Sequence, residues 1–212
     1  MRFIVAIDGT AGSGKGTIGR AISSHYNFKY LDTGLLYRAA AFNLRSFSCD
    51  LARISEKNIL QAIQSINKNI LELKELRENE IGEIASLIAT KPSVREKLLV
   101  YQRDFANQEG GAVLDGRDIG TVVCPDADVK IFVDATESVR AQRRFNQLKE
   151  QNFETSYNEV LTNLRKRDTQ DRIRKIAPMV PSKDALLLDS SDISIQESLD
   201  IIILRINTEL KK

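Results

Sequence analysis

Short apolar runs alternate with longer segments of helical periodicity along most of the chain. The first run, residues 3–7 (FIVAI), ends at Asp8 and Gly9, and similar runs occupy 28–33, 113–115, 130–135 and 185–191. Short runs bounded by polar or turn residues predict strands of a parallel sheet that is buried on both faces. Alternation of such strands with helices predicts an α/β fold with a five-stranded parallel sheet flanked by helices.

Helical spacing is clearest in four segments, residues 15–25, 139–151, 157–173 and 195–210. The last two open with Ser-x-x-Glu capping boxes, Ser156/Glu159 and Ser194/Glu197. Residues 53–109 are also mostly helical in pattern, with a short strand predicted at 70–76 (ILELKEL). We expect this stretch to be inserted between two strands of the core.

Composition narrows the class of protein. The 212 residues suit one domain, and 42% hydrophobic and 28% charged residues with a net charge of +2 are typical of a globular protein without a broad nucleic-acid-binding surface. No apolar stretch is long enough for a membrane span, and the start lacks a signal pattern, so we expect no membrane partner and a cytoplasmic location. Cys49 and Cys124 are isolated, and we expect buried, reduced thiols. His25 is the sole histidine and has no partner pattern.

A glycine-rich loop follows the first predicted strand and precedes the first predicted helix. It matches G-x-x-x-x-G-K, and its residues are Gly9, Thr10, Ala11, Gly12, Ser13, Gly14 and Lys15. Glycines let several backbone N–H groups point at one anion, and the positive end of the following helix adds to the attraction. We predict a phosphate-binding loop in which Lys15 reaches the β- and γ-phosphate oxygens. A glycine-rich packing turn is the alternative, and it leaves Lys15 unexplained.

The loop departs from the general motif after its lysine. Gly16 follows Lys15, and Thr17 comes one position later. This GKGT variant is typical of nucleoside monophosphate kinases. The chain has neither an N-K-x-D guanine-binding motif nor a convincing Walker B strand, which argues against a GTPase and against an ATP-driven motor.

Arginines lie where an anionic second substrate would need them, because the planar guanidinium pairs with phosphate oxygens and keeps its charge. LDTGLLYR (31–38) brings Thr33 and Arg38 to the crevice beyond the strand ends, and DGRDIGT (115–121) brings Arg117 and Asp118 to the same edge. In RKRDTQDRIR (165–174), spacings of four and three place one set on a single helix face: Arg167, Asp171 and Arg174. From composition alone, that helix could equally be a solvated face with internal ion pairs.

These motifs together resemble the bacterial cytidylate kinases over nearly the whole chain. The matching stretches are IDGTAGSGKGT, YLDTGLLYR, KPSVREKLLVYQRDFA, LDGRDIGTVVCPDADVKIFVDA, RAQRR, LRKRDTQDRIRKIAPMVP and ALLLDSS. The resemblance implies a P-loop NTPase-like fold that transfers the γ-phosphoryl group of ATP to CMP or dCMP with Mg²⁺, acting as a monomer. It also implies one domain, with a core at 1–52 and 110–212, a monophosphate-binding insert at 53–109 and a short lid at 165–178.

The same resemblance implies roles for individual residues. Residues 9–17 would hold the ATP phosphates, with Thr17 a candidate ligand of Mg²⁺ and water supplying most of its shell. Four residues, Lys15, Arg38, Arg117 and Arg174, would offset the repulsion between the two reacting phosphates. The CMP-binding residues would be Thr33 and Arg38 at sugar and phosphate, Ser86, Arg95 and Asp118 at the cytosine edge, Arg117 and Arg174 at the phosphate, and Arg167 with Asp171 at the ribose.

Two other functions remain open at this point. One is a small-molecule kinase with the same core that accepts UMP, AMP or a non-nucleotide; Ser86, Arg95 and Asp118 favour cytosine instead. The other is a catalytically silent nucleotide-binding module. The presence of Lys15 opposite a second set of arginines argues against it, since a sensor would not need two anion clamps.

Overall fold

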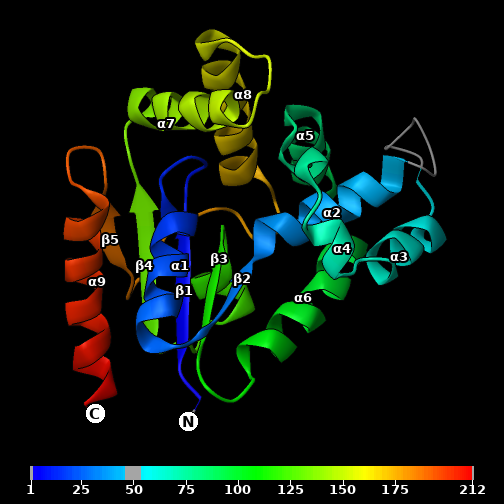
Figure 1. Ribbon diagram of the computed structural model, residues 1–212. Coiled ribbons are helices and arrows are strands. Elements are labelled where there is room, and N and C mark those ends of the chain that lie inside the picture. The colour runs from blue at the N-terminus through cyan, green and yellow to red at the C-terminus, as the bar shows by residue number, and fades with distance from the viewer. Residues whose placement is uncertain (1, 46–53, 212) are drawn as a thin grey trace.

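The computed structural model describes residues 2–45 and 54–211. Its five strands are all parallel and form one sheet in the order β2-β3-β1-β4-β5 (Figure 1). They are β1 Ile4–Gly9, β2 Lys29–Asp32, β3 Ala112–Gly116, β4 Val129–Asp134 and β5 Leu186–Asp189. The prediction of a five-stranded parallel sheet flanked by helices is confirmed.

Both faces of the sheet are covered, which explains the uninterrupted apolar runs. Alternate residues of β1 enter two different cores: Ile4 packs on one side, and Val5 and Ile7 on the other. Helices α1 (Lys15–Tyr26) and α9 (Ile195–Leu210) cover the Val5 face, and α2 (Thr33–Arg45) and α6 (Pro92–Ala106) cover the Ile4 face (Figure 1). Helix α9 begins at the predicted Ser194/Glu197 capping box.

The segment between α2 and β3 is helical throughout its described part. It contains α3 (Glu56–Gln64), α4 (Lys68–Leu71), the 3₁₀ turn η2 (Lys74–Arg77), α5 (Asn79–Ile88) and α6. The strand predicted at 70–76 is therefore wrong. The Asn67 side chain accepts a hydrogen bond from Ile70 N and begins a helix there, and Leu76 packs into the core around α2 without pairing to any strand. The predicted boundary at 52/53 and Cys49 lie outside the described residues.

Two helices lie beyond the carboxyl ends of the strands, α7 (Glu137–Glu150) and α8 (Tyr157–Ile173) (Figure 1). Helix α8 begins at the predicted Ser156/Glu159 capping box. The two helices share a small core with one residue of the glycine-rich loop, Ala11. Helix α8 also contacts α5, so the inserted segment and the strand-end helices face each other across the carboxyl edge of the sheet.

Candidate functional site

The glycine-rich loop leaves β1 in a backbone conformation that only glycine tolerates at several points. Gly9, Gly12 and Gly14 have φ values of 145°, 77° and 91°. A Cβ on Gly9 would lie 1.9 Å from the carbonyl oxygen of Val133, so no larger residue fits there. Helix α1 starts directly after Gly14 with no side-chain cap, and the buried Ser13 Oγ has no hydrogen-bond partner. An uncapped helix start and a buried hydroxyl without a partner are both features that suit an anion site.

Lys15 is buried at the start of α1, where its Nζ donates a 2.8 Å hydrogen bond to the carbonyl oxygen of Thr10. Burial, followed by repulsion from Arg117, lowers the pKa of Lys15 to about 7, although Asp115 and Asp32 pull in the opposite direction. The ammonium thus lacks sufficient negative charge around it. A phosphate at this position would supply that charge.

Two carboxylates stand beside the lysine at the ends of neighbouring strands. Asp32 of β2 and Asp115 of β3 are register partners, and burial together with Asp32 raises the pKa of Asp115 to about 7. The Tyr30 hydroxyl donates to Asp115 Oδ2 at 2.6 Å. Paired carboxylates in this position suit a divalent cation that takes oxygen ligands and keeps several waters. Within the described part of the chain, no group of three or more His, Cys, Asp or Glu is arranged for a metal.

This pair was missed by the sequence analysis, which proposed only Thr17. The Thr17 side chain is exposed in the first turn of α1. A usable signal was present, since Asp115 ends one predicted strand and Asp32 is the next-to-last residue of another. Asp115 and Tyr30 also leave little room at Gly16, the residue that marks the GKGT variant: a Cβ there would lie 3.2 Å from Asp115 Oδ2 and 3.4 Å from the Tyr30 hydroxyl.

A cluster of three arginines from three different elements lies close enough together for the guanidiniums to repel one another. Arg38 comes from α2, Arg144 from α7 and Arg167 from α8. Burial is the main cause that lowers the pKa of each guanidinium, and the other arginines lower it further: Arg38 falls well below its usual range, Arg144 to about 10, and Arg167 is lowered as well. The cluster holds more positive charge than the surrounding protein neutralises, which favours an anionic ligand.

Several of the predicted arginines form hydrogen bonds with other residues of the chain. Arg38 donates through Nη1 to the carbonyl oxygens of Leu76 (2.6 Å) and Glu78 (3.1 Å). Arg117 donates through Nε to Asp171 Oδ2 at 2.8 Å; burial opposes its charge, but Asp171 raises its pKa. By contrast, the buried Arg167 Nε has no hydrogen-bond partner. Arg144 was not predicted as a site residue, although it lies in the RAQRR stretch.

Asp118 joins two more of the predicted residues. One carboxylate oxygen accepts from Arg95 Nη2, and the other accepts from Arg174 Nη2 at 3.0 Å. All three side chains are buried, and Arg174 also donates through Nε to the carbonyl oxygen of Ala177 at 2.6 Å. Ser86, on α5, has a buried hydroxyl with no partner. Asp118 therefore orients two guanidiniums in addition to offering lone pairs to a ligand.

A buried carboxylate on β1 holds the backbone that follows Asp118. Asp8 accepts hydrogen bonds of 2.7 Å from the N–H groups of Ile119 and Gly120, at the start of the π-helical turn η3 (Ile119–Val123). Thr33 is held at the end of the neighbouring strand β3, because its hydroxyl donates to the carbonyl oxygen of Asp115 at 2.7 Å. Asp8 was also missed by the sequence analysis. It positions the segment that carries Arg117 and Asp118.

The basic helix has one buried face and one exposed face. Asp171 and Arg174 are buried and paired, whereas Arg165, Lys166 and Arg172 are exposed. The solvated-face interpretation is therefore wrong for the Arg167, Asp171, Arg174 side, and the structure brings these residues to Arg117 and Asp118.

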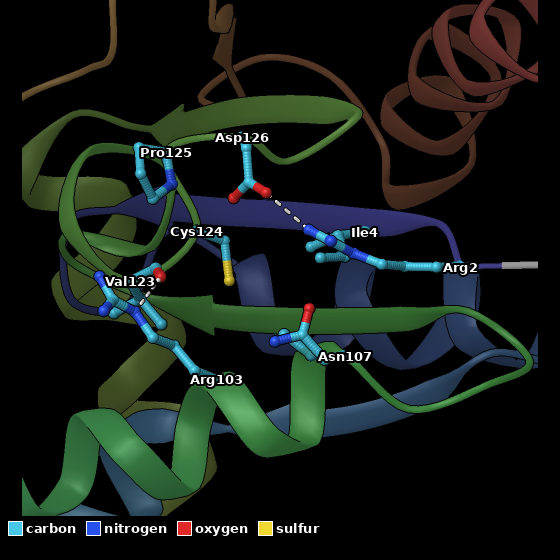
Figure 2. A pocket seen from close by; sticks show the side chains of 9 residues that line it. Arg2, Ile4, Arg103, Asn107, Val123, Cys124, Pro125 and Asp126 are labelled. Atoms are coloured by element: carbon cyan, nitrogen blue, oxygen red, sulfur yellow. Dashed lines mark hydrogen bonds and ion pairs between the residues drawn. The ribbon is translucent and has the colours of Figure 1, made fainter.

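A separate cavity of about 260 Å³ lies at the opposite, amino edge of the sheet. Figure 2 shows it between Arg2 and Ile4 at the start of β1, the end of α6 and the segment around Cys124, whose sulfur points into it. Arg103 closes one side by donating to the carbonyl oxygen of Val123. Cys124 is buried and free, as expected, and burial raises the pKa of its thiol to about 11. This cavity shares no lining residue with the phosphate-binding loop.

Comparison with known proteins gives a consistent result over the length of the chain. A family model described as cytidylate kinase matches residues 5–208. A cytidylate kinase of Bartonella henselae is 47% identical over 199 residues, which is 94% of this chain and 92% of that protein. A cytidylate kinase of Cereibacter sphaeroides is 46% identical over 201 residues, or 94% and 93%. A gluconokinase structure from Sinorhizobium meliloti aligns over 100% of this chain and 98% of its own with a TM-score of 0.51 and 12% identity, which speaks to the fold alone.

None of the helices in residues 2–45 and 54–211 combines the length and apolarity needed to cross a membrane.

Proposed function

Because the chain belongs to the cytidylate kinase family, we propose that it transfers the γ-phosphoryl group of ATP to CMP, giving ADP and CDP. One observation of the site carries this proposal: Lys15 at the phosphate-binding loop and Arg117 at the arginine cluster are close enough that Arg117 depresses the pKa of Lys15. Two anion-binding regions thus meet at one point. A transferase that joins two phosphates needs this arrangement, whereas a single-ligand sensor does not.

The donor phosphates belong at the loop of residues 9–17. Backbone N–H groups, the unpartnered Ser13 hydroxyl and the Lys15 ammonium would hold them. Asp32 and Asp115, with Thr17, are the residues we propose around Mg²⁺. When bound, the ion would neutralise phosphate charge.

We place the acceptor phosphate among Arg38, Arg117 and Arg167, and we add Arg144, which the sequence analysis did not include. This moves Arg167 to the phosphate from the ribose, the role that the resemblance implied for it. The lowered pKa values of these arginines are the support for three of them, because an anion would relieve the repulsion that produces those shifts. Arg174 joins them through Asp118 and Asp171. The acceptor is already a phosphate, so no strong general base is needed and the protein mainly positions and neutralises charge.

The base would be selected at Ser86, Arg95 and Asp118. Cytosine carries an amino donor where uracil carries a carbonyl acceptor, and the Asp118 carboxylate attracts the first and repels the second. The Ser86 hydroxyl, buried without a partner, is available for a further hydrogen bond. None of these contacts requires a 2′-hydroxyl, so we extend the proposal to dCMP as an acceptor.

The remaining parts of the proposal concern the state of the enzyme. We propose a monomer, as the resemblance to the cytidylate kinases implies, and a cytoplasmic location, because both substrates are cytoplasmic nucleotides. The insert at 53–109 and the lid at 165–178 are proposed to close over the substrates. The contact of Lys166 with Glu83 at 3.0 Å supports such an approach of α8 to α5. Closure would exclude water and limit ATP hydrolysis.

The test is a measurement of ADP and product formation from ATP and Mg²⁺, with nucleotides separated chromatographically. The acceptors are CMP, dCMP, UMP, AMP, GMP and none. Lys15→Met should abolish turnover, and Lys29→Met, an exposed lysine of β2 bonded to Gln108, serves as the matched control that should keep it.

Turnover with CMP and dCMP above all other acceptors is the expected result. Preference for another acceptor would refute the roles of Ser86, Arg95 and Asp118 but keep the two anion sites. ATP binding without turnover on any acceptor would refute the kinase proposal and favour a silent nucleotide-binding module.

A further inference from the structure

Ala11, in the phosphate-binding loop, is held at both of its backbone polar atoms by a buried ion pair. Its carbonyl oxygen accepts from Arg140 Nη1 at 3.0 Å, and its N–H donates to Asp168 Oδ1 at 3.1 Å. Arg140, on α7, and Asp168, on α8, also bond directly to each other, and both are buried. Arg140 is fixed in addition by its Nε, which donates to the carbonyl oxygen of Ala135 at 2.8 Å.

The neighbouring loop residues are fixed from the same side. The Thr10 hydroxyl donates to Asp134 Oδ1 at 2.6 Å, at the carboxyl end of β4. A Cβ on Gly12 would lie 3.0 Å from the carbonyl oxygen of Arg140, which shows how closely the loop approaches α7. The loop before Gly12 is therefore attached to strand β4 and to both helices beyond it.

Helix α8 carries the acceptor-side residues next to this attachment. Asp168 directly follows Arg167, and Asp171, one turn later, binds Arg117 at 2.8 Å. A single rigid helix thus contacts the donor loop through Asp168 and the acceptor cluster through Arg167 and Asp171. The relative position of the two reacting phosphates depends on how α8 sits against Ala11.

We propose that Arg140 and Asp168 are positioning residues, which hold the phosphate-binding loop and the acceptor side of α8 at the separation that phosphoryl transfer requires. This inference rests on the proposed kinase function. Misplacement of reacting groups by about 1 Å can cost about 100-fold in rate, so loss of the attachment should lower turnover strongly. Neither residue is assigned a contact with a substrate.

Removal of one partner alone is a poor test, because it leaves a buried, unpaired charge and can unfold the protein. Replacement of both by apolar residues of similar size avoids that penalty, and such replacements of buried ion pairs are often neutral for stability. The informative variant is therefore the double substitution Arg140→Met with Asp168→Leu. Its control is Arg2→Met with Asp126→Leu, which removes an exposed pair of the same residue types at the amino edge of the sheet.

We expect the core double variant to stay folded, with a lower unfolding temperature because three hydrogen bonds to the backbone of Ala11 and Ala135 are lost, worth about 1 kcal/mol each. At a temperature where it is folded, it should lose about 100-fold in kcat with CMP. Hydrogen–deuterium exchange in the peptide spanning residues 9–14 should speed up, since the Ala11 N–H loses its acceptor. The control should change neither quantity. A folded core double variant with parental kcat would overturn the proposal. It would also be overturned if kcat rose from the single variants to the double variant in parallel with the unfolding temperature.

The exchange measurement separates this inference from the proposed function. If the parent chain phosphorylates no acceptor, the kinase proposal fails, but the attachment of Ala11 is still tested by exchange. If the parent is active and exchange at 9–14 is unchanged in the core double variant, the attachment itself is refuted.

Discussion

Arg38 offers the sharpest test of the acceptor site, because function and stability should respond differently to its removal. It lies on α2, and burial, followed by repulsion from Arg167 and Arg144, lowers its pKa well below the usual range. Such an arginine is costly to hold in the absence of an anion. We predict that Arg38→Met, which keeps the length of the side chain but not its charge, lowers turnover without unfolding the protein.

The magnitude follows from the contacts. Loss of an arginine that stabilises a phosphoryl-transfer transition state costs about 1,000-fold or more in kcat, which is about 4 kcal/mol at 1.36 kcal/mol per tenfold. On the stability side, two hydrogen bonds to the carbonyl oxygens of Leu76 and Glu78 are lost, worth about 1 kcal/mol each. Relief of the buried positive charge opposes this loss. The net loss should therefore be smaller than about 2 kcal/mol, so the unfolding temperature should fall by only a few degrees, at about 2–4 °C per kcal/mol.

The assay is steady-state turnover with CMP and ATP, together with thermal unfolding of the same preparations. Arg45→Met, a more exposed arginine of the same helix 3.6 Å from Glu78, is the matched control and should keep both properties. Parental kcat in Arg38→Met would refute the placement of Arg38 at the acceptor phosphate. A large fall in unfolding temperature would refute the argument that its charge is poorly accommodated.

Four further predictions concern Ser86, Lys15 and Gly19. Ser86→Ala should lower kcat/KM for CMP by about 2- to 10-fold, the value of one hydrogen bond, with unchanged thermal stability because the hydroxyl has no protein partner; a drop in stability would contradict this. The pKa of Lys15 is about 7 in the free protein, so Lys15 should take up a proton when ATP binds at pH 8. Titration calorimetry in buffers of different ionisation enthalpy measures this uptake, and uptake that persists in Lys15→Met would refute the assignment to Lys15. The same shift makes the Lys15 contribution to stability rise with pH between about 7 and 10, since the unfolded chain there binds the extra proton. Gly19→Ala should destabilise the fold by about 1–3 kcal/mol in urea unfolding, because its Cβ would lie 2.8 Å from the Tyr30 ring; a more stable variant would contradict the crowding argument.

The sequence analysis was wrong at one segment, and from composition left another open, where the local pattern was ambiguous. The stretch 70–76 alternates like a strand, but it has no neighbouring strand to pair with, and Leu76 instead enters the core around α2. The basic helix could not be distinguished from a solvated one until Asp171 and Arg174 were seen to be buried. In both cases the deciding information was which surface the segment packs against. The insert, the lid and the ligand assigned to each site residue stay predictions.

The sequence by itself determined the five strands of the sheet, the two capping boxes and the phosphate-binding loop. These depend on properties of a few consecutive residues: apolar periodicity, hydrogen bonds across one helical turn, and glycine where φ is positive. Interactions between residues close in the sequence are enough to form such features, so they can be predicted from the sequence directly.

Only the tertiary structure decided which distant charges share a buried space. The strand order β2-β3-β1 sets Asp32 opposite Asp115, and the folding of α7 and α8 over the strand ends brings Arg140 and Asp168 to Ala11. Burial then turns these proximities into large effects, because in a poorly solvated interior each charge depends on its nearest neighbours for stabilisation. No local pattern carries that information, since the partners are far apart in the chain and meet only after the sheet is assembled.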